Sequence, residues 1–591
     1  MYFSAVDRFG ARPVALRSKR DGRWVDLGYR ELADRVQDLS IGLLELGVAP
    51  GDRVALLSEN RPEWAIADYA CLAARCTDVP IYPTLPSRHA EYILRDSSAV
   101  AILVSTPAQV DKVLAAKARL PALRHVIAFD RAAVREGVLG VEEVMARGHG
   151  ARAAHAEWRA RALAARPDDL ATLIYTSGTT GDPKGVMLTH GNIASNVTMC
   201  LGLFDFSPAD ECLSFLPLSH IFERMFGHYM MFQAGVTINY AESFETVPAD
   251  MQARRPTVMA AVPRLYEKIY GRVLESVRTS AAPRRRIFAW SRRAGEAWAD
   301  RVIAGGRMPA SLAVKRAIAD RLVFARIRAR TGGRIRLFIS GGAPLAPEII
   351  RFFYAAGLPI VEGYGLTETS PVIAVNAPGH VRLGTVGRPL PGVEVRTADD
   401  GEIVTRGPHV MRGYFDKPDA TAEAIDEEGW FHTGDIGVLD GDGFLRITDR
   451  KKDLIVTAGG KNIAPQPIEN LARSSKFVAN AVMLGDRRPF PIMLVVPNLE
   501  SVKGWAIEQR ITVDDPELLL ARPDVRQKIE REVRRALRDL AQFEMPKKLL
   551  LLTQEFSVET GELTPKLSVR RRVVEDRHRE AIESLYAEAH A

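Results

Sequence analysis

The chain has 591 residues, of which 47% are hydrophobic and 26% charged, which excludes a fibre or a disordered chain. No apolar run approaches the roughly 18 residues of a membrane-spanning helix, and no secretion signal precedes residue 20. The net charge of +7 leaves nucleic acid, anionic membranes and anionic small molecules open as partners. The cysteines show no Cys-x-x-Cys motif and no Cys/His metal-ligand spacing, which indicates buried, reduced thiols in a cytoplasmic protein. They are Cys71, Cys76, Cys200 and Cys212.

The first 380 residues alternate between short apolar runs and helical stretches. The predicted strands are 54–57, 100–104, 126–129, 170–175, 258–262, 335–339 and 359–361. A helix is predicted over 63–74, with Pro62 in its first turn. This alternation favours an α/β fold with mainly parallel sheets covered by helices on both faces. Ligands of such sheets bind beyond the carboxyl ends of strands, so we expect the functional residues in the turns there.

Residues 284–336 are strongly basic. They hold 15 Lys or Arg and 3 Asp or Glu, a net charge of +12 that exceeds that of the whole chain. An apolar set falls near helical spacing within them: Phe288, Trp290, Ala294, Ala297 and Trp298. One interpretation is a solvated helical excursion that packs this stripe on its own domain. The alternative is a contact with the anionic head groups of a membrane surface. No nucleic-acid motif accompanies the charge.

Glycine and proline become frequent after about residue 380, and short β-type runs appear at 393–396 and 402–405. This texture predicts a small β subdomain at about 380–449. A charged break follows at 449–453, and beyond it we expect a helix that opens at Pro465 and strands at 481–484 and 492–496. We therefore predict a large domain at 1–449 and a smaller α+β domain at 450–591.

The strongest local signal directly follows the predicted strand at 170–175. Residues 175–185 read Tyr-Thr-Ser-Gly-Thr-Thr-Gly-Asp-Pro-Lys-Gly. The glycines let backbone N–H groups approach an anion, the hydroxyls add neutral donors, and Lys184 adds a positive charge. This combination predicts a polyphosphate site. The loop is not a Walker P-loop, because Gly185 follows Lys184 where that motif has Ser or Thr.

This loop and several ordered motifs resemble the acyl-adenylate-forming (AMP-binding) enzymes over about residues 5–580, and most of all the long-chain fatty-acid–CoA ligases. The resemblance implies that the β- and γ-phosphates of ATP bind Thr176, Ser177, Gly178, Thr179, Thr180 and Lys184. It implies an adenine-side turn at 340–345 with Gly342, Ala343 and Pro344. The family's central motif falls on Glu362, Gly363, Tyr364, Gly365, Thr367 and Glu368.

Individual roles follow from the same resemblance. Tyr364 would stack on adenine and Thr367 would contact the α-phosphate. Glu368, with Thr176, would bind Mg²⁺, a hard cation that prefers oxygen ligands. The remaining matches are Asp435 and Arg450 for the ribose, Asp449 and Lys452 for a hinge, and Gly459, Gly460 and Lys461 for the approach of the CoA thiol.

Two segments, 216–224 and 461–469, resemble the long-chain branch in particular. His220 would lie beside the acyl carboxylate, although a structural histidine is the alternative. A set of large apolar residues follows at helical spacing, typical of a core stripe or of the wall of an acyl tunnel. These residues are Met225, Phe226, Met230, Met231 and Phe232. No charged residue stands out as a partner for an amino or sugar group, which favours a plain fatty acid.

The last motif departs from the family pattern. Ser568 holds the position where the family has the lysine that neutralises charge during attack on the α-phosphate. Lys566 lies two residues earlier, on the same face of an extended chain but about 7 Å away. We predict that Lys566 takes this role, with Arg570 as a substitute or slow adenylation as the alternatives.

Together these residues predict an enzyme that uses Mg-ATP to convert a long-chain fatty acid to acyl-AMP and pyrophosphate. CoA would then displace AMP after rotation of the second domain about 449–452. One alternative is an acyl-AMP ligase that loads a separate carrier protein. The other is a degenerate homologue that only binds nucleotide and lipid.

Overall fold

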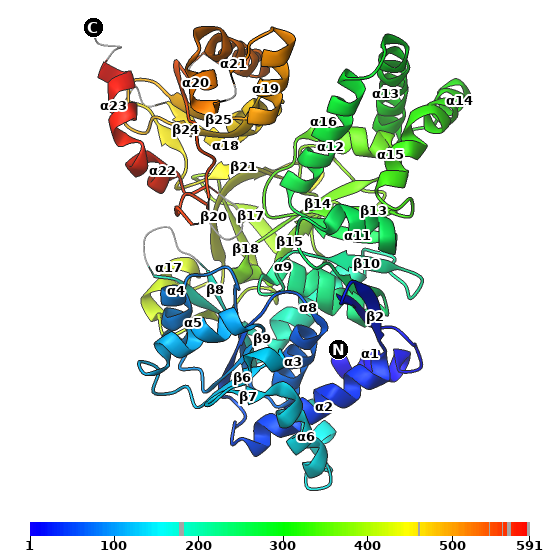
Figure 1. Cartoon of the computed structure of the whole chain (residues 1–591), viewed down its shortest axis with the longest axis vertical. Helices are drawn as coiled ribbons and strands as arrows, with labels where there is room; N and C mark the ends of the chain where they lie inside the picture. The colour runs from blue at the N-terminus through cyan, green and yellow to red at the C-terminus, as the bar shows by residue number, and fades with distance from the viewer. Residues whose placement is uncertain are drawn as a thin grey trace. The chain divides into compact units, whose positions relative to one another are not determined.

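The computed structural model describes residues 1–176, 182–458, 461–513, 515–542, 544–557, 559–563 and 569–587. They form two compact units (Figure 1). The first comprises Met1–Val395, Thr405–His432 and Gly441–Leu445. The second comprises Arg396–Val404, Thr433–Asp440 and the chain from Arg446 onward. The predicted fold class, a large α/β body with a smaller carboxyl-terminal domain, is confirmed.

An eight-stranded sheet lies in the first unit, in the order β19-β9-β8-β4-β3-β5-β6-β7. Its strands are β3 (Arg53–Leu57), β4 (Thr77–Ile81), β5 (Ala101–Val104), β6 (His125–Ala128), β7 (Leu139–Gly140), β8 (Leu170–Thr176), β9 (Lys184–Thr189) and β19 (Gly413–Tyr414). The strands from β8 to β7 are parallel, whereas β9 and β19 join one edge antiparallel. The predicted strands of this region are confirmed, but β4, β7, β9 and β19 were not predicted.

The second sheet of this unit has nine strands in the order β16-β15-β14-β13-β12-β10-β11-β1-β2. They are β1 (Leu16–Arg20), β2 (Arg23–Leu27), β10 (Glu211–Ser214), β11 (Thr237–Tyr240), β12 (Val258–Ala261), β13 (Leu337–Ser340), β14 (Ile360–Gly365), β15 (Val372–Val375) and β16 (Arg388–Pro389). Its centre, from β11 to β14, is parallel. Carboxyl ends of neighbouring strands therefore meet at one edge, as the sequence predicts.

The helices of the first unit begin and end at local signals. Pro62 opens α3, and Thr189 and Asn192 form a reciprocal cap at the start of α8. The α-helices are α1 (Tyr2–Phe9), α2 (Tyr29–Glu45), α3 (Pro62–Ala73), α4 (Ser87–Asp96), α5 (Pro107–Lys117), α6 (Val141–Ala151), α7 (Trp158–Leu163), α8 (His190–Leu201), α9 (Ile221–Glu223), α10 (Met231–Gln233), α11 (Val247–Arg254), α12 (Pro263–Arg278), α13 (Ala282–Ile303), α14 (Ala310–Ala319), α15 (Ala325–Arg330), α16 (Pro347–Ala355) and α17 (Pro418–Ala424). Short 3-10 or π segments are η1 (Arg131–Ala133), η2 (Arg224–Met230), η3 (Asp320–Phe324) and η4 (Thr367–Thr369).

A three-stranded sheet forms the centre of the second unit, with β24 (Val478–Leu484), β25 (Ile492–Pro497) and β26 (Lys548–Leu551) in sequence order. A small hairpin precedes it, made of β22 (Ile455–Val456) and β23 (Asn462–Ile463). The helices are α18 (Pro465–Arg473), α19 (Leu499–Glu508), α20 (Pro516–Ala521), α21 (Pro523–Ala536), α22 (Arg571–Arg577) and α23 (Arg579–Ala587). A further four-stranded sheet contains β17 (Glu394–Thr397), β18 (Glu402–Arg406), β20 (Phe431–Leu439) and β21 (Leu445–Arg450).

The predicted apolar stripe after His220 packs into the main core of the first unit, where all five of its residues are buried. Arg224, in the same segment, is fully buried and forms ion pairs with Asp68 and, at 2.6 Å, with Asp78. Its guanidinium also donates to the Thr172 hydroxyl at 2.8 Å. These contacts tie η2, which follows β10 of the nine-stranded sheet, to α3 and to β4 and β8 of the eight-stranded sheet.

The four cysteines are buried and free, as predicted. Within the described ranges, the structure contains no helix whose length and apolar character would let it traverse a bilayer.

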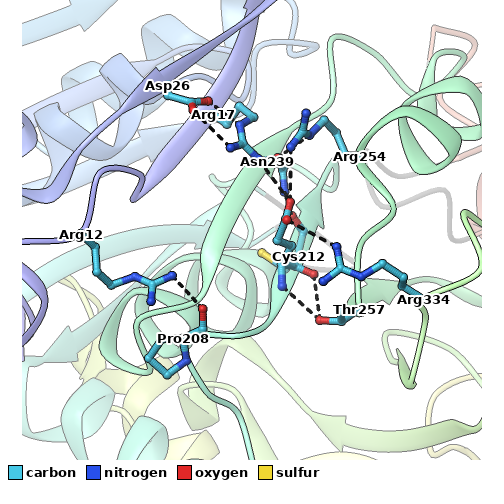
Figure 2. Close-up of polar contacts among 10 residues, drawn as sticks. Arg12, Arg17, Asp26, Pro208, Cys212, Asn239, Arg254, Thr257 and Arg334 are labelled. Atoms are coloured by element: carbon cyan, nitrogen blue, oxygen red, sulfur yellow. Dashed lines mark hydrogen bonds and ion pairs between the residues drawn. The ribbon is translucent and has the colours of Figure 1, made fainter.

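A polar network closes the amino ends of β10 and β11 (Figure 2). The Glu211 carboxylate lies 3.2 Å from Arg17, 3.5 Å from Arg254 and 3.6 Å from Arg334, measured to the nearest guanidinium nitrogen. The Glu211 N–H donates to the Thr257 hydroxyl at 3.0 Å. One carboxylate thus offsets the mutual repulsion of three cations from three segments of the unit.

We expect Glu211→Gln to lower the free energy of unfolding by about 1 to 2 kcal/mol, because three guanidinium groups, two of them partly buried, lose their shared counter-charge. Urea unfolding measures the change. Glu242→Gln, which removes a single exposed ion pair with Lys19, is the matched control and should change it by less than about 0.5 kcal/mol. Equal effects of the two substitutions would contradict the network's role.

Candidate active site

Three of the predicted segments meet beyond the carboxyl ends of neighbouring strands. The turn with Gly342, Ala343 and Pro344 follows β13, and the run from Glu362 to Gly365 ends β14; Ser340 and Glu362 are register partners. The segment with His220 follows β10. Its Phe222 packs against the first turn, since a Cβ on Gly341 would lie 3.0 Å from the Phe222 ring. Sequence segments more than 100 residues apart therefore share one edge.

Glu362 joins two of these segments. Its Oε1 accepts a hydrogen bond from the Leu345 N–H at 3.2 Å, which holds the turn after β13 against the end of β14. The carboxyl is buried, and burial raises its pKa to about 7, although the Leu345 N–H acts in the opposite direction. Glu362 is thus a positioning group for the turn.

Gly365 sits where no side chain fits. A Cβ there would lie 1.7 Å from the Pro371 carbonyl oxygen. The same carbonyl accepts from the Leu366 N–H at 3.1 Å. This close approach turns the chain from β14 into η4, which carries Thr367 and Glu368.

The hairpin of β8 and β9 carries the predicted phosphate loop. Thr176 and Lys184 are register partners at the loop end of this hairpin, so they stand on either side of the predicted phosphate loop. Ser177, Gly178, Thr179 and Thr180 lie outside the described residues.

Tyr414 was missed by the sequence analysis and connects the two sheets. It lies on β19, paired with Val186 of β9. Its hydroxyl donates to Glu368 Oε1 at 3.1 Å, and the Lys184 Nζ lies 5.0 Å from its ring centroid. Burial, and then the nearby Glu368 carboxylate, raise the Tyr414 pKa, so the hydroxyl stays protonated and remains a donor. Tyr414 thus contacts both the Lys184 cation, through its ring, and the Glu368 carboxylate, through its hydroxyl.

His220 is oriented by its own backbone. Its Nδ1 accepts from the Phe222 N–H at 3.0 Å, so in the neutral ring Nε2 carries the proton and is a donor. The ring faces Tyr82 edge-on, with centroids 6.5 Å apart. The structure therefore gives His220 a hydrogen-bonded orientation and a defined tautomer.

The second unit brings together the predicted ribose residues Asp435 and Arg450. The Arg450 Nε lies 3.1 Å from Asp435 Oδ1, and Asp435 is almost fully buried. Asp449, at the predicted hinge, accepts from the N–H groups of Arg450 at 2.6 Å and Gln466 at 3.3 Å. Burial raises the Asp449 pKa to about 6 against these two hydrogen bonds. Lys452 follows two residues after Arg450.

In the second unit, a backbone hydrogen bond joins the two ends of the segment that contains the turn predicted for the CoA thiol. The Thr457 N–H donates to the Lys461 carbonyl at 3.0 Å. Gly459, Gly460 and Lys566 lie outside the described residues.

Glu368 suits Mg²⁺ held partly by nucleotide phosphates. The described residues contain no cluster of three or more His, Cys, Asp and Glu that would cage a metal by itself. Magnesium commonly uses one or two carboxylates and completes its shell with water and phosphate. The single carboxylate of Glu368, oriented by Tyr414, fits that pattern.

Comparison with known proteins matches this architecture to adenylate-forming enzymes. Residues 3–415 match the AMP-binding enzyme family, and residues 452–590 match the AMP-binding enzyme C-terminal domain. The chain belongs to the AMP-binding enzyme family.

Curated relatives cover almost the whole chain. Long-chain-fatty-acid–CoA ligase FadD15 of Mycobacterium bovis is 38% identical over 575 residues, 96% of this chain and 93% of the relative. The peroxisomal long chain acyl-CoA synthetase 7 of Arabidopsis thaliana is 34% identical over 596 residues, 96% of this chain and 82% of the relative.

Solved structures share the fold at lower identity. The anthranilate CoA ligase AuaEII, in complex with anthranoyl-AMP, has a TM-score of 0.75 at 17% identity and covers 98% of each chain. The adenylation domain of a carboxylate reductase from Mycobacterium chelonae has a TM-score of 0.75 at 24% identity, over 99% of this chain and 90% of that chain.

We expect Glu362→Gln to flatten the pH dependence of stability. Because the folded pKa is raised from 4.5 to about 7, the stability linked to this carboxyl is fully present below pH 4.5 and falls as pH rises toward 7. Glutamine keeps the acceptor for the Leu345 N–H but does not ionise.

Urea unfolding between pH 4.5 and 7 measures the difference. Glu348→Gln, at an exposed position at the start of α16, is the control and should keep the wild-type slope. A wild-type slope in Glu362→Gln would refute the buried, protonated carboxyl.

Proposed function

We propose that this chain is an AMP-forming long-chain fatty-acid–CoA ligase. The observation that carries the proposal is the pair of contacts that Tyr414 makes with Lys184 and Glu368, which joins the end of the phosphate-loop hairpin to the central motif. A triphosphate needs a cation and a metal-binding carboxylate side by side, and these residues supply both. The curated relatives at 33–38% identity include long-chain-fatty-acid–CoA ligases that match nearly the full chain.

The first unit binds the nucleotide in this proposal. Thr176 and Lys184, with Ser177, Gly178, Thr179 and Thr180, hold the β- and γ-phosphates. Thr367 contacts the α-phosphate, and Tyr364 stacks on adenine against the turn after β13. Glu368 and Thr176 hold Mg²⁺, which neutralises phosphate charge when bound. The nucleotide is also contacted by residues of the turn after β13 and of the end of β14, namely Gly342, Ala343, Pro344, Glu362, Gly363 and Gly365.

The reaction has two balanced steps. A carboxylate oxygen of the fatty acid, oriented by the Nε2–H of His220, attacks the α-phosphorus while the bond to pyrophosphate breaks. Lys184 and Lys566 neutralise the developing charge. The CoA thiol then releases its proton to solvent, its sulfur attacks the acyl carbon, and the bond from that carbon to AMP breaks, while Asp435 and Arg450 hold the ribose of the leaving AMP. The turn from Gly459 to Lys461 admits the thiol after rotation about Asp449 and Lys452.

We also propose that the acyl acceptor is free CoA and that the preferred fatty acid has a long chain. Pyrophosphate exchange with saturated fatty acids of increasing length should peak among the long chains. Free acyl-CoA should then accumulate when CoA is added. Exchange without free acyl-CoA would favour loading of a carrier protein, and no exchange with any acid would favour a degenerate binding protein.

We expect Tyr414→Phe to slow adenylation by about tenfold, because Glu368 loses a hydrogen bond while the ring under Lys184 remains. The requirement for Mg²⁺ should rise in pyrophosphate exchange, and excess Mg²⁺ should restore part of the rate. Tyr92→Phe, which removes a hydroxyl that contacts Asp96 at 3.4 Å, is the control and should behave as wild type. A wild-type Mg²⁺ profile in Tyr414→Phe would rule out the positioning role.

We expect Lys566→Ala to abolish pyrophosphate exchange and to spare thioester formation from a supplied acyl-adenylate. The lysine acts only while the α-phosphorus is attacked. Arg570→Ala is the comparison, and a selective loss there instead would assign the charge to Arg570. Equal loss of both half-reactions in Lys566→Ala would remove Lys566 from the mechanism.

We also propose that the basic segment at 284–336 makes a peripheral contact with a membrane. It would place the enzyme where its lipid substrate is concentrated.

A further inference from the structure

Four of the five residues in the apolar stripe that the sequence offered for a membrane are turned inward, and the fifth, Ala297, is exposed. Phe288 and Ala294 of α13 are buried, and Trp290 and Trp298 pack against the core around Phe352. The interpretation of this stripe as packing on its own domain is therefore the one that the structure supports. Figure 1 shows α13 and α14 (green) side by side at the margin of the first unit, and the two helices are in contact.

A different stripe is exposed on the neighbouring helix. Val314, Ile318 and Leu322, spaced four residues apart along α14 and η3, are 59%, 48% and 44% exposed. The opposite side of this helix is fixed inward. Phe324 is fully buried, and the Arg316 guanidinium lies 5.0 Å from the Trp298 ring centroid. The aliphatic face thus points to solvent because the other face is held on α13.

Unpaired cations border this face. Lys315, Arg321, Arg326 and Arg330 are exposed, and none has an acidic partner among the described residues. Asp320 is the only acidic residue in 310–330, and it is occupied by Arg316 and Arg328, each at 2.6 Å. The flank of the stripe therefore carries four positive charges that no acidic residue in the described part of the chain pairs with.

We propose that Val314, Ile318 and Leu322, with Lys315, Arg321 and Arg326, form a docking surface for an anionic lipid bilayer. We call these six residues the α14 surface. Aliphatic side chains enter the boundary between head groups and acyl chains, while lysine and arginine reach the lipid phosphates beside them. A nucleic acid would use the cations but gain nothing from three exposed aliphatic residues. This surface acts without nucleotide and goes beyond the proposed chemistry.

Vesicle flotation of the full chain, without ATP or CoA, tests the surface directly. The chain should bind vesicles of phosphatidylcholine with about 30% phosphatidylglycerol and bind pure phosphatidylcholine weakly. Val314→Ser, Ile318→Ser and Leu322→Ser combined should lower the partition coefficient by about tenfold or more. Lys315→Gln, Arg321→Gln and Arg326→Gln combined should abolish the preference for the anionic lipid.

Matched control variants distinguish binding through the α14 surface from non-specific binding of exposed aliphatic or basic residues to vesicles. Val25→Ser with Val134→Ser removes two aliphatic residues that are each 43% exposed elsewhere in the first unit. Arg23→Gln, Arg88→Gln and Arg131→Gln combined remove the same number of exposed charges. Both controls should bind vesicles as wild type does. Thermal melting confirms that every variant is folded.

Three outcomes would overturn the proposal. The first is equal binding of wild type to neutral and anionic vesicles, and the second is equal loss of binding in the α14 variants and their controls. The third is a dimer of the full chain that the serine variant dissociates while neither form binds vesicles, which would make this face a contact between copies. Because no catalytic step enters the assay, failure here leaves the proposed function standing.

Discussion

The backbone ladder at one edge of the eight-stranded sheet is the constraint on which the rest depends. β9 pairs antiparallel with β8, which sets Thr176 opposite Lys184, and β19 pairs with β9, which sets Tyr414 opposite Val186. Side chains alternate between the faces of a strand, so a slip of one residue in β19 would turn Tyr414 away from Glu368. Backbone hydrogen bonds over a few residues therefore decide whether cation and carboxylate share one site.

Buried polar groups give the surroundings of this site a definite arrangement. Glu362 fixes the turn after β13 through the Leu345 N–H, and Arg224 ties η2 to α3 and β4 through Asp68 and Asp78. Such groups cost desolvation, and the cost is offset only where hydrogen bonds and counter-charges are supplied. They favour one packing over others, which a site built from distant segments requires.

The sequence predicts the local motifs well and their partners poorly. Glycine, hydroxyl and lysine spacing marks the loop around Lys184, and apolar runs mark most parallel strands. The sequence does not predict the role of Tyr414, because β19 is only two residues long and the contact of Tyr414 with Glu368 spans 46 residues of sequence. The near-helical spacing of apolar residues in α13 predicts an apolar stripe, but it does not predict whether the stripe faces the core or solvent. That depends on how α13 packs against α16 and α14. Only the folded chain shows that Val314 and its neighbours remain exposed instead.

The most direct test of the central claim is a crystal structure of the chain with Mg-ATP. The account predicts phosphates between Thr176 and Lys184, a magnesium ion on Glu368, and the Tyr414 hydroxyl still bonded to that carboxylate. A triphosphate bound away from these residues, with Glu368 and Lys184 free of it, would contradict the account.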